Sequence, residues 1–229
     1  MKLSIIIPCY NEKNTLVELV KKVESAPIGN IEKEIIVVDD ASSDGTRELI
    51  KNHLNGHKII LNEKNEGKGA CIRKAIEHVT GDMVIIQDAD LEYDPGDYAA
   101  LISPLISRKH RVVYGSRERN RENKTHSGWR FYIGGLFVTW FTNVLYGSKL
   151  TDEPTCYKAF DVKLLRSLPL ECEHFEFCPE VTAKILKRGI TIKELPIRYY
   201  PRTRAQGKKI KWRDGLQALW VLLKYRFVD

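Results

Sequence analysis

Residues 83–92, with the sequence MVIIQDADLE, are the stretch that decides the fold class of this chain. An apolar, β-branched run from Met83 to Gln87 leads directly into two aspartates, Asp88 and Asp90. Such a run predicts a buried β-strand. Alternate residues of a strand point to the same side, so the two carboxylates can share one ligand. A turn before Pro95 would also account for aspartates at this position.

The same alternation of apolar runs and polar loops continues through the first 115 residues. Strands are expected at Leu3–Ile7, Glu34–Val38, Lys58–Leu61, Met83–Gln87 and Arg111–Tyr114. Segments with apolar residues at helical spacing separate them, at Lys13–Ala26, Asp44–Leu54, Lys68–Val79 and Pro95–Ser107. Strands that alternate with helices predict an α/β fold with a largely parallel sheet, whose ligands gather at the carboxyl ends of the strands.

The second half of the chain is less regular. Helices are expected at Gly128–Leu145, Glu176–Arg188 and Trp212–Phe227, with a strand near Thr191–Tyr199 and a loop through Thr151–Tyr157. The sequence contains no internal repeat, low-complexity tract or linker. We therefore expect residues 1–229 to form a single domain.

Composition and charge narrow the class of partner. The 229 residues are 43% hydrophobic and 29% charged, which is typical of a globular domain and excludes disorder. The formal net charge of +7 favours anionic partners, and the basic residues gather in 108–130 and 198–213. No aromatic-plus-basic RNA-binding pattern is found, so a phosphorylated substrate or a lipid surface is expected rather than nucleic acid.

Cysteine usage and hydrophobicity bear on location. The five cysteines are scattered without a CxxC pair, and no secretory signal pattern opens the chain, so we expect a reducing, cytoplasmic setting. No run reaches the length of a transmembrane helix. The aromatic-rich segments Gly128–Tyr146 and Trp212–Phe227 suit a bilayer interface, although core helices can carry the same pattern.

Loops at the ends of two other predicted strands also contain residues suited to ligand binding. Asp39 and Asp40 follow the second strand, where hydroxyls of a ribose or N–H groups of a base would satisfy them. Gly67-Lys68-Gly69 opens a helix after the third strand, which favours an anionic ligand or, equally, a tight loop. Carboxylates from neighbouring strand ends would meet at one crevice and could hold Mg²⁺ or Mn²⁺ against a diphosphate.

A basic segment, residues 202–211, precedes the last predicted helix. Its cations, Arg202, Arg204, Lys208 and Lys209, suit charge-assisted contacts with phosphate groups. A solvated loop or a patch facing a membrane would have the same composition.

Five short motifs in one order support a family assignment. They are Tyr10-Asn11-Glu12, Asp39-Asp40 with Asp44-Gly45-Thr46, Gly67-Lys68-Gly69, Asp88-Ala89-Asp90 and Gly115-Ser116-Arg117. Together they resemble a family 2 glycosyltransferase of the GT-A fold, and within it the dolichyl- or polyprenyl-phosphate mannose synthase branch. The resemblance extends from Leu3 to about Phe227.

The resemblance implies roles for individual residues in donor binding. Residues 1–115 would bind the nucleotide-sugar and residues 116–229 the acceptor. The implied donor-binding residues are Pro8, Tyr10, Glu12, Val38, Asp40, Lys68, Asp88, Ala89, Asp90, Arg204, Lys208 and Lys209. The implied metal ligands are Asp90, Glu92 and Asp88, with Glu92 in place of a glutamine that the family often has.

The resemblance also implies the reaction. Asp90, Arg117 and Asp152 would be catalytic, and Arg117, Arg130 and Arg202 would bind the acceptor. Cys156 stands where the family usually has glycine or serine. The implied activity is inverting transfer of mannose or glucose, from GDP-mannose or UDP-glucose, to polyprenyl or dolichyl phosphate. The enzyme would lie on the cytoplasmic face of a membrane, with or without a separate membrane subunit.

Two alternatives share parts of this pattern. A glycosyltransferase with an alcohol acceptor would have every donor-site motif, but would need a general base that a phosphate acceptor does not need. A non-catalytic nucleotide-binding module would leave Asp88 and Asp90 without a role.

Overall fold

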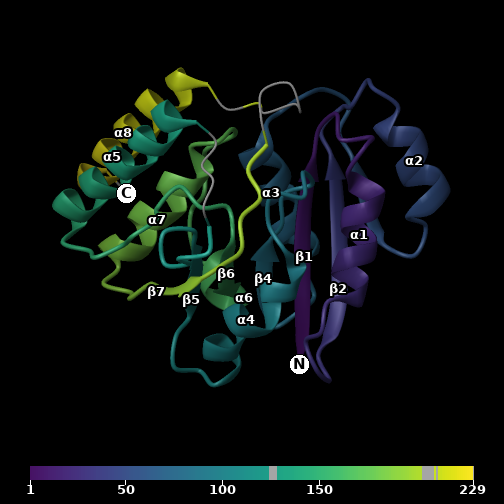
Figure 1. Cartoon of the computed structure of the whole chain (residues 1–229), viewed down its shortest axis with the longest axis horizontal. Coiled ribbons are helices and arrows are strands. Elements are labelled where there is room, and N and C mark those ends of the chain that lie inside the picture. Colours follow the sequence, from purple (N-terminus) through teal and green to yellow (C-terminus); the bar gives the residue numbers. More distant parts are fainter. Residues whose placement is uncertain (124–127, 203–208, 210, 229) are drawn as a thin grey trace.

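The computed structural model describes residues 1–123, 128–202, 209 and 211–228. Within these residues, seven strands form one sheet with helices on both faces, as Figure 1 shows. The order of the strands is β3-β2-β1-β4-β6-β5-β7. The α/β class predicted from the sequence is therefore confirmed.

The first half of the sheet is parallel. Strand β1 (Lys2–Cys9) lies between β2 (Glu32–Asp39) and β4 (Met83–Ile86), and β3 (Lys58–Leu61) pairs with the outer side of β2. All of these neighbours run in the same direction, so their carboxyl ends lie at one edge of the sheet. That edge contains the carboxylate-bearing loops.

The second half contains a strand that the sequence analysis missed. Strand β6 (Lys158–Asp161) runs antiparallel between β4 and β5 (Val112–Ser116), and β7 (Lys193–Pro196) pairs parallel with β5. With only four residues and two charged ends, β6 has too short an apolar pattern to be recognised. Because β6 is antiparallel, its beginning lies at the edge where β4 and β5 end. The predicted loop before it therefore opens onto that edge.

Helices cover the two faces of the sheet with separate apolar cores. Helices α1 (Leu16–Ser25), α2 (Thr46–His53) and α4 (Tyr98–Ile106) contribute to one core, and the short helix η1 (Pro95–Asp97) leads into α4. Helices α3 (Lys68–His78), α6 (Val162–Arg166) and α7 (Phe177–Lys187) contribute to the other. The predicted helix from residue 13 begins only at Leu16, because residues 12–15 form a turn closed by the Thr15 N–H to Glu12 carbonyl bond.

Two long helices lie outside these layers. Helices α5 (Trp129–Tyr146) and α8 (Trp212–Phe227) run side by side next to α7 on the left of Figure 1. A small third core joins the three helices through Val138, Ala183, Val221, Leu222 and Tyr225. Their outer sides are left without a covering layer among the described residues.

A prediction concerns the close packing of Gly69 at the start of α3. A Cβ atom at this position would lie 2.5 Å from the carbonyl oxygen of Cys172 and 3.0 Å from that of His174. We expect Gly69→Ala to lower the free energy of unfolding by about 1–3 kcal/mol, as overpacking does. Urea denaturation measures this. Gly134→Ala is the control, because it meets no atom within 4 Å and should be neutral or slightly stabilising.

Candidate active site

A cavity of about 1070 Å³ opens at the carboxyl edge of the sheet. It is lined by residues from the loops after β1, β2 and β4, from the start of α3 and from α5 and α8. Asp40, Asp88 and Asp90 all lie on its wall, as the sequence analysis predicted for one shared crevice. A space of this size and chemical mixture suits a small-molecule substrate.

Asp88 and Asp90 have different electrostatic surroundings. The ammonium group of Lys68 forms an ion pair with Asp88. Burial alone would raise the pKa of Asp88. The charge of Lys68 outweighs this effect, so the pKa of Asp88 lies below its ordinary value. Burial, Asp88 and Glu92 together raise the pKa of Asp90 to about 7, against the opposing effect of Arg202. Burial is the largest cause of this raised pKa, and repulsion from the neighbouring carboxylates adds to it.

This charge pattern fits a divalent cation, which would relieve the repulsion. Among the described residues, no three acidic, histidine or cysteine side chains gather as a complete metal site. Mg²⁺ commonly takes one or two carboxylates and completes its shell with substrate phosphate and water. Asp88 and Asp90 match that requirement. Glu92 accepts hydrogen bonds from the Tyr199 hydroxyl (2.9 Å) and the Arg202 N–H (2.9 Å), so its predicted role as a ligand would require exchange of these partners.

Cations from the basic segment reach the same carboxylates. The Arg202 guanidinium lies 2.8 Å from Asp90 and 3.0 Å from Glu12. The Lys209 ammonium lies 2.6 Å from Glu12 and also contacts the Tyr10 carbonyl. Arg202 and Lys209 thus bring positive charge beside Asp90 and Glu12, and cations of this kind suit contacts with phosphate groups.

Asp40 shapes the cavity by holding the loop before α3. Its carboxylate accepts the N–H groups of Glu66 and Gly67, both at 2.8 Å, and the Asn62 amide at 2.9 Å. Asp39 points elsewhere and pairs with Arg47 at 2.6 Å. Of the two acids after β2, Asp40 is therefore the one that lines the cavity.

Arg117 and Asp152 form one ion-paired unit on the cavity wall. The guanidinium donates two hydrogen bonds to the carboxylate, of 2.7 and 2.6 Å, and the Arg117 N–H adds a third of 2.8 Å. Glu194 of β7 fixes the loop of Asp152 by accepting its N–H at 3.0 Å and that of Thr151 at 2.9 Å. These contacts hold the Arg117 guanidinium at the cavity wall.

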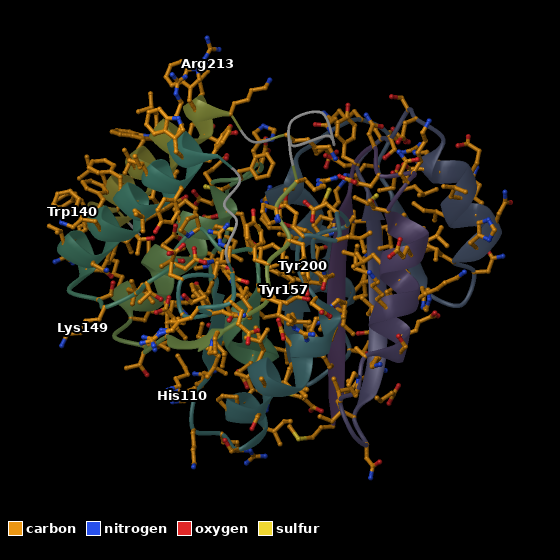
Figure 2. All side chains as sticks on the ribbon, in the orientation of Figure 1. His110, Trp140, Lys149, Tyr157, Tyr200 and Arg213 are labelled. Atoms are coloured by element: carbon orange, nitrogen blue, oxygen red, sulfur yellow. The ribbon has the colours of Figure 1, made fainter. Side chains whose placement is uncertain are left out.

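Tyrosines to which the sequence analysis assigned no role support one wall of the cavity. Tyr157 donates to the Gln87 amide oxygen and its ring stacks on Tyr93 at 4.8 Å between centroids. Tyr93 in turn contacts the Tyr199 ring, over which Arg117 lies at 5.2 Å. Figure 2 shows Tyr157 in the middle of the molecule. Tyr93 and Tyr157 each follow a polar loop in the sequence, but no tyrosine follows the loops at residues 39–46 and 62–69, so this spacing does not single them out.

The remaining predicted residues are placed as follows. Pro8 and Ala89 line the cavity, and Arg130 lies on its wall with its guanidinium over the Trp129 ring. The Val38 side chain is buried in the core, so only its main chain could face a nucleotide. Arg204 and Lys208 fall outside the described residues.

Comparison with known proteins agrees with this fold. The model of the family "Glycosyl transferase family 2" matches residues 4–168. This chain therefore belongs to glycosyl transferase family 2, and it is a glycosyltransferase.

Curated relatives give the class of substrate that similar proteins use. A UDP-N-acetylglucosamine–dolichyl-phosphate N-acetylglucosaminyltransferase of Methanococcus voltae is 29% identical, over 90% of this chain and 89% of its own length. A dolichyl-phosphate beta-glucosyltransferase of Trichomonas vaginalis is 27% identical, over 91% and 68%. A dodecaprenyl-phosphate galacturonate synthase of Rhizobium johnstonii is 25% identical, over 91% and 62%.

Solved structures confirm the GT-A fold. Glucosyl-3-phosphoglycerate synthase of Mycobacterium tuberculosis, in complex with Mn²⁺, UDP and phosphoglyceric acid, superposes with a TM-score of 0.75. The alignment covers 100% of this chain and 79% of that one at 17% identity. The same enzyme has also been solved with Mg²⁺ and UDP, with a TM-score of 0.73.

None of the helices in the described part of the chain combines the length and the hydropathy that crossing a bilayer requires.

Proposed function

We propose that this enzyme transfers a sugar from a nucleoside diphosphate sugar to the phosphate of a polyprenyl or dolichyl phosphate, with Mg²⁺ or Mn²⁺ bound by Asp88 and Asp90. The observation that carries the proposal is one cavity in which this carboxylate pair faces several cations. These cations are Lys68, Arg117, Arg202 and Lys209. A site for two ligands that both bear phosphate needs positive groups of this kind.

The relatives support both substrates. Those named above act on dolichyl or dodecaprenyl phosphate by their names, and one of them uses a UDP-linked sugar. We therefore place a UDP-sugar, such as UDP-glucose or UDP-N-acetylglucosamine, ahead of GDP-mannose as the donor.

The geometry suggests how the reaction would proceed. When bound, the metal ion would neutralise charge on the departing nucleoside diphosphate. Lys68, which already pairs with Asp88, would add a second positive charge beside the leaving group. Arg117, oriented by Asp152, would hold the acceptor phosphate. Because a phosphate is ionised near neutral pH, positioning replaces proton removal and no side chain serves as an obligatory base.

Two assays test the proposal in sequence. A thermal-shift panel of UDP, GDP and their sugars with Mn²⁺ identifies the donor, because a bound ligand raises the melting temperature. The preferred radiolabelled donor is then incubated with undecaprenyl phosphate. Label that enters the organic phase and is released by mild acid supports a lipid-phosphate acceptor. Label transferred only to an alcohol acceptor contradicts it, and so does nucleotide binding without any transfer.

We also propose that the outer faces of α5 and α8 place the enzyme on a membrane surface. Large apolar side chains stand exposed there, with Trp140 56% and Trp220 64% exposed. Figure 2 shows Trp140 on the outer rim of the molecule. The exposed set is Trp129, Ile133, Leu136, Phe137, Trp140, Val144, Trp212, Leu216, Trp220, Leu223 and Phe227. Basic residues such as Arg130 and Arg213 lie among them, as in helices that rest at a bilayer interface. The cavity reaches these helices through Gly135 and Gly215, so a lipid acceptor would enter from that side.

This surface gives a prediction. Trp140→Glu and Trp220→Glu should each weaken binding to vesicles of phosphatidylglycerol and phosphatidylcholine at least about tenfold, because each removes a large apolar side chain from the interface. Vesicle flotation measures the binding. Ile106→Glu is the matched control, since Ile106 is an exposed apolar residue at the end of α4. Equal weakening by all three variants would contradict the assignment of this face.

A further inference from the structure

A buried glutamine lies directly before the two aspartates of the cavity. Gln87 follows the apolar strand β4, and its side chain is fully buried. Its main-chain N–H donates to the Ile6 carbonyl of β1 at 2.9 Å, so it extends the pairing of β4 with β1 by one residue. A buried amide side chain is costly unless its oxygen and its nitrogen both find hydrogen-bond partners. The partners of Gln87 therefore indicate what this residue does.

Two tyrosine hydroxyls share the amide oxygen of Gln87. Tyr98, the first residue of α4, donates to it at 2.7 Å, and Tyr157, which precedes β6, donates at 2.5 Å. Both tyrosines are fully buried. The Gln87 amide nitrogen donates in turn to the Asp88 carbonyl at 2.9 Å. The glutamine side chain is thus fixed from two separate elements, and it holds the main chain of the residue that follows it.

Tyr157 also contacts the other end of the segment that contains the two aspartates. We call this segment, residues 88–93, the 88–93 loop. The Tyr157 ring stacks on Tyr93, the last residue of the loop, at 4.8 Å between centroids. Its hydroxyl reaches the first residue, Asp88, through Gln87. One side chain therefore holds both ends of the loop, and a buried network with its partners satisfied is rigid.

The backbone of the 88–93 loop needs this support. Leu91 has a φ of 63°, in the left-handed region that a residue with a large side chain adopts only at a cost. Across this residue, the Asp90 carboxylate accepts the Glu92 N–H at 3.1 Å. A strained conformation persists only where the surrounding structure determines it. The positions of Asp88 and Asp90 therefore depend on contacts that hold the loop from outside.

We propose that Gln87 and Tyr157 are positioning residues, which fix the 88–93 loop so that Asp88 and Asp90 are preorganised for a divalent cation and a nucleoside diphosphate. The described residues that line the cavity include neither Gln87 nor Tyr157, so both act through the loop. Residues that orient metal ligands from behind commonly change metal affinity by about 10–100-fold when they are altered. The inference rests on the proposed function, because it takes Asp88 and Asp90 to hold the cation.

Two variants and one control test the proposal. Tyr157→Phe removes the hydroxyl that holds Gln87 and keeps the ring on Tyr93. Gln87→Met removes the amide and keeps a side chain of similar length. Tyr114→Phe is the matched control, because Tyr114 is also fully buried and its hydroxyl lies 3.0 Å from the Thr182 hydroxyl. Tyr114 belongs to the core on the other face of the sheet, away from Tyr157.

Hydrogen exchange on the full chain without ligands measures the loop directly. We expect peptides that contain residues 88–93 to exchange about fivefold faster in Tyr157→Phe and in Gln87→Met, the factor for the loss of one buried hydrogen bond. Tyr114→Phe should leave the exchange of these peptides unchanged, even where its melting temperature falls. Wild-type exchange in both loop variants, or an equal acceleration in the control, overturns the proposal.

Calorimetry measures the consequence for the proposed metal site. The nucleotide that the thermal-shift panel selects, UDP or GDP, is titrated into each protein once with Mn²⁺ and once with EDTA. The ratio of the two dissociation constants gives the gain in affinity that depends on the metal ion. We expect both loop variants to lower this gain on the order of tenfold and to keep the affinity in EDTA. Tyr114→Phe should keep the wild-type ratio, which a general loss of stability would not distinguish.

The outcomes separate the inference from the proposed function. If the wild-type protein shows the metal-dependent gain and both loop variants keep it, the positioning role is overturned while the proposed function stands. If the wild-type protein shows no such gain, the proposed function fails. Hydrogen exchange alone then still decides whether Gln87 and Tyr157 hold the 88–93 loop.

Discussion

Asp90→Asn is expected to lose on the order of 10³-fold in kcat, the upper range for removing one charge-stabilising group from a site. The substitution keeps the shape of the side chain but removes the charge that would hold the metal ion. Because Asp88 and Glu92 already crowd Asp90 with negative charge, the folded protein should be no less stable without it. Initial rates with saturating donor and lipid phosphate, together with a melting curve, measure both effects.

Asp82→Asn is the matched control for this experiment. Asp82 directly precedes β4 and accepts the Lys2 N–H at 2.8 Å, so it lies at the opposite end of the strand that leads to Asp90. Its variant should keep wild-type turnover. A second readout is Mn²⁺ binding in the presence of UDP, followed by electron paramagnetic resonance, which Asp90→Asn should weaken. Wild-type turnover and Mn²⁺ affinity in Asp90→Asn would refute the metal assignment.

Arg117→Lys is expected to lower kcat/KM for the lipid phosphate by about 10²-fold, while nucleotide binding changes little. Lysine keeps the positive charge but cannot reproduce the two parallel hydrogen bonds to Asp152 or the planar contact with a phosphate. Alanine is a poorer choice, because it would leave the buried Asp152 carboxylate unpaired at a cost of about 3 kcal/mol.

Arg111→Lys separates this effect from a general loss of ion pairing. Arg111 immediately precedes β5 and pairs with Asp161 at 2.9 Å, whereas Arg117 immediately follows β5. The two variants therefore alter ion pairs at opposite ends of one strand. Kinetics and calorimetry on both should show a loss only for Arg117→Lys and only toward the acceptor. An equal loss of nucleotide affinity in Arg117→Lys would show that the division into donor and acceptor groups is wrong.

The parts of the site that follow directly from strand periodicity were predictable from the sequence. Asp88 and Asp90 end a buried parallel strand, and Asp40 ends its near neighbour, so topology alone places them at one edge. The sequence could not distinguish Asp39 from Asp40, because their difference depends on which loop each carboxylate meets. Asp40 holds the loop before α3, whereas Asp39 meets Arg47.

Contacts between distant segments were beyond the sequence analysis. Tyr199 donates to Glu92 across 107 residues, and Arg202 reaches Asp90 across 112. No local pattern reports such a pairing, because it depends on where the folded chain places Tyr199 and Arg202. Strand β6 was missed for the same reason. Its short, charged sequence forms a strand only because β4 lies on one side of it and β5 on the other.

The order of the strands has a consequence for how the chain would fold during synthesis. Strands β1, β2, β3 and β4 are neighbours in the sheet and all belong to the first part of the chain, so they can assemble as soon as that part leaves the ribosome. Strand β5 cannot complete its pairing at that stage, because its two partners, β6 and β7, are synthesised after it. Until then its apolar edge needs protection, and we expect nascent chains that stop before residue 193 to depend on chaperones more than the complete protein does.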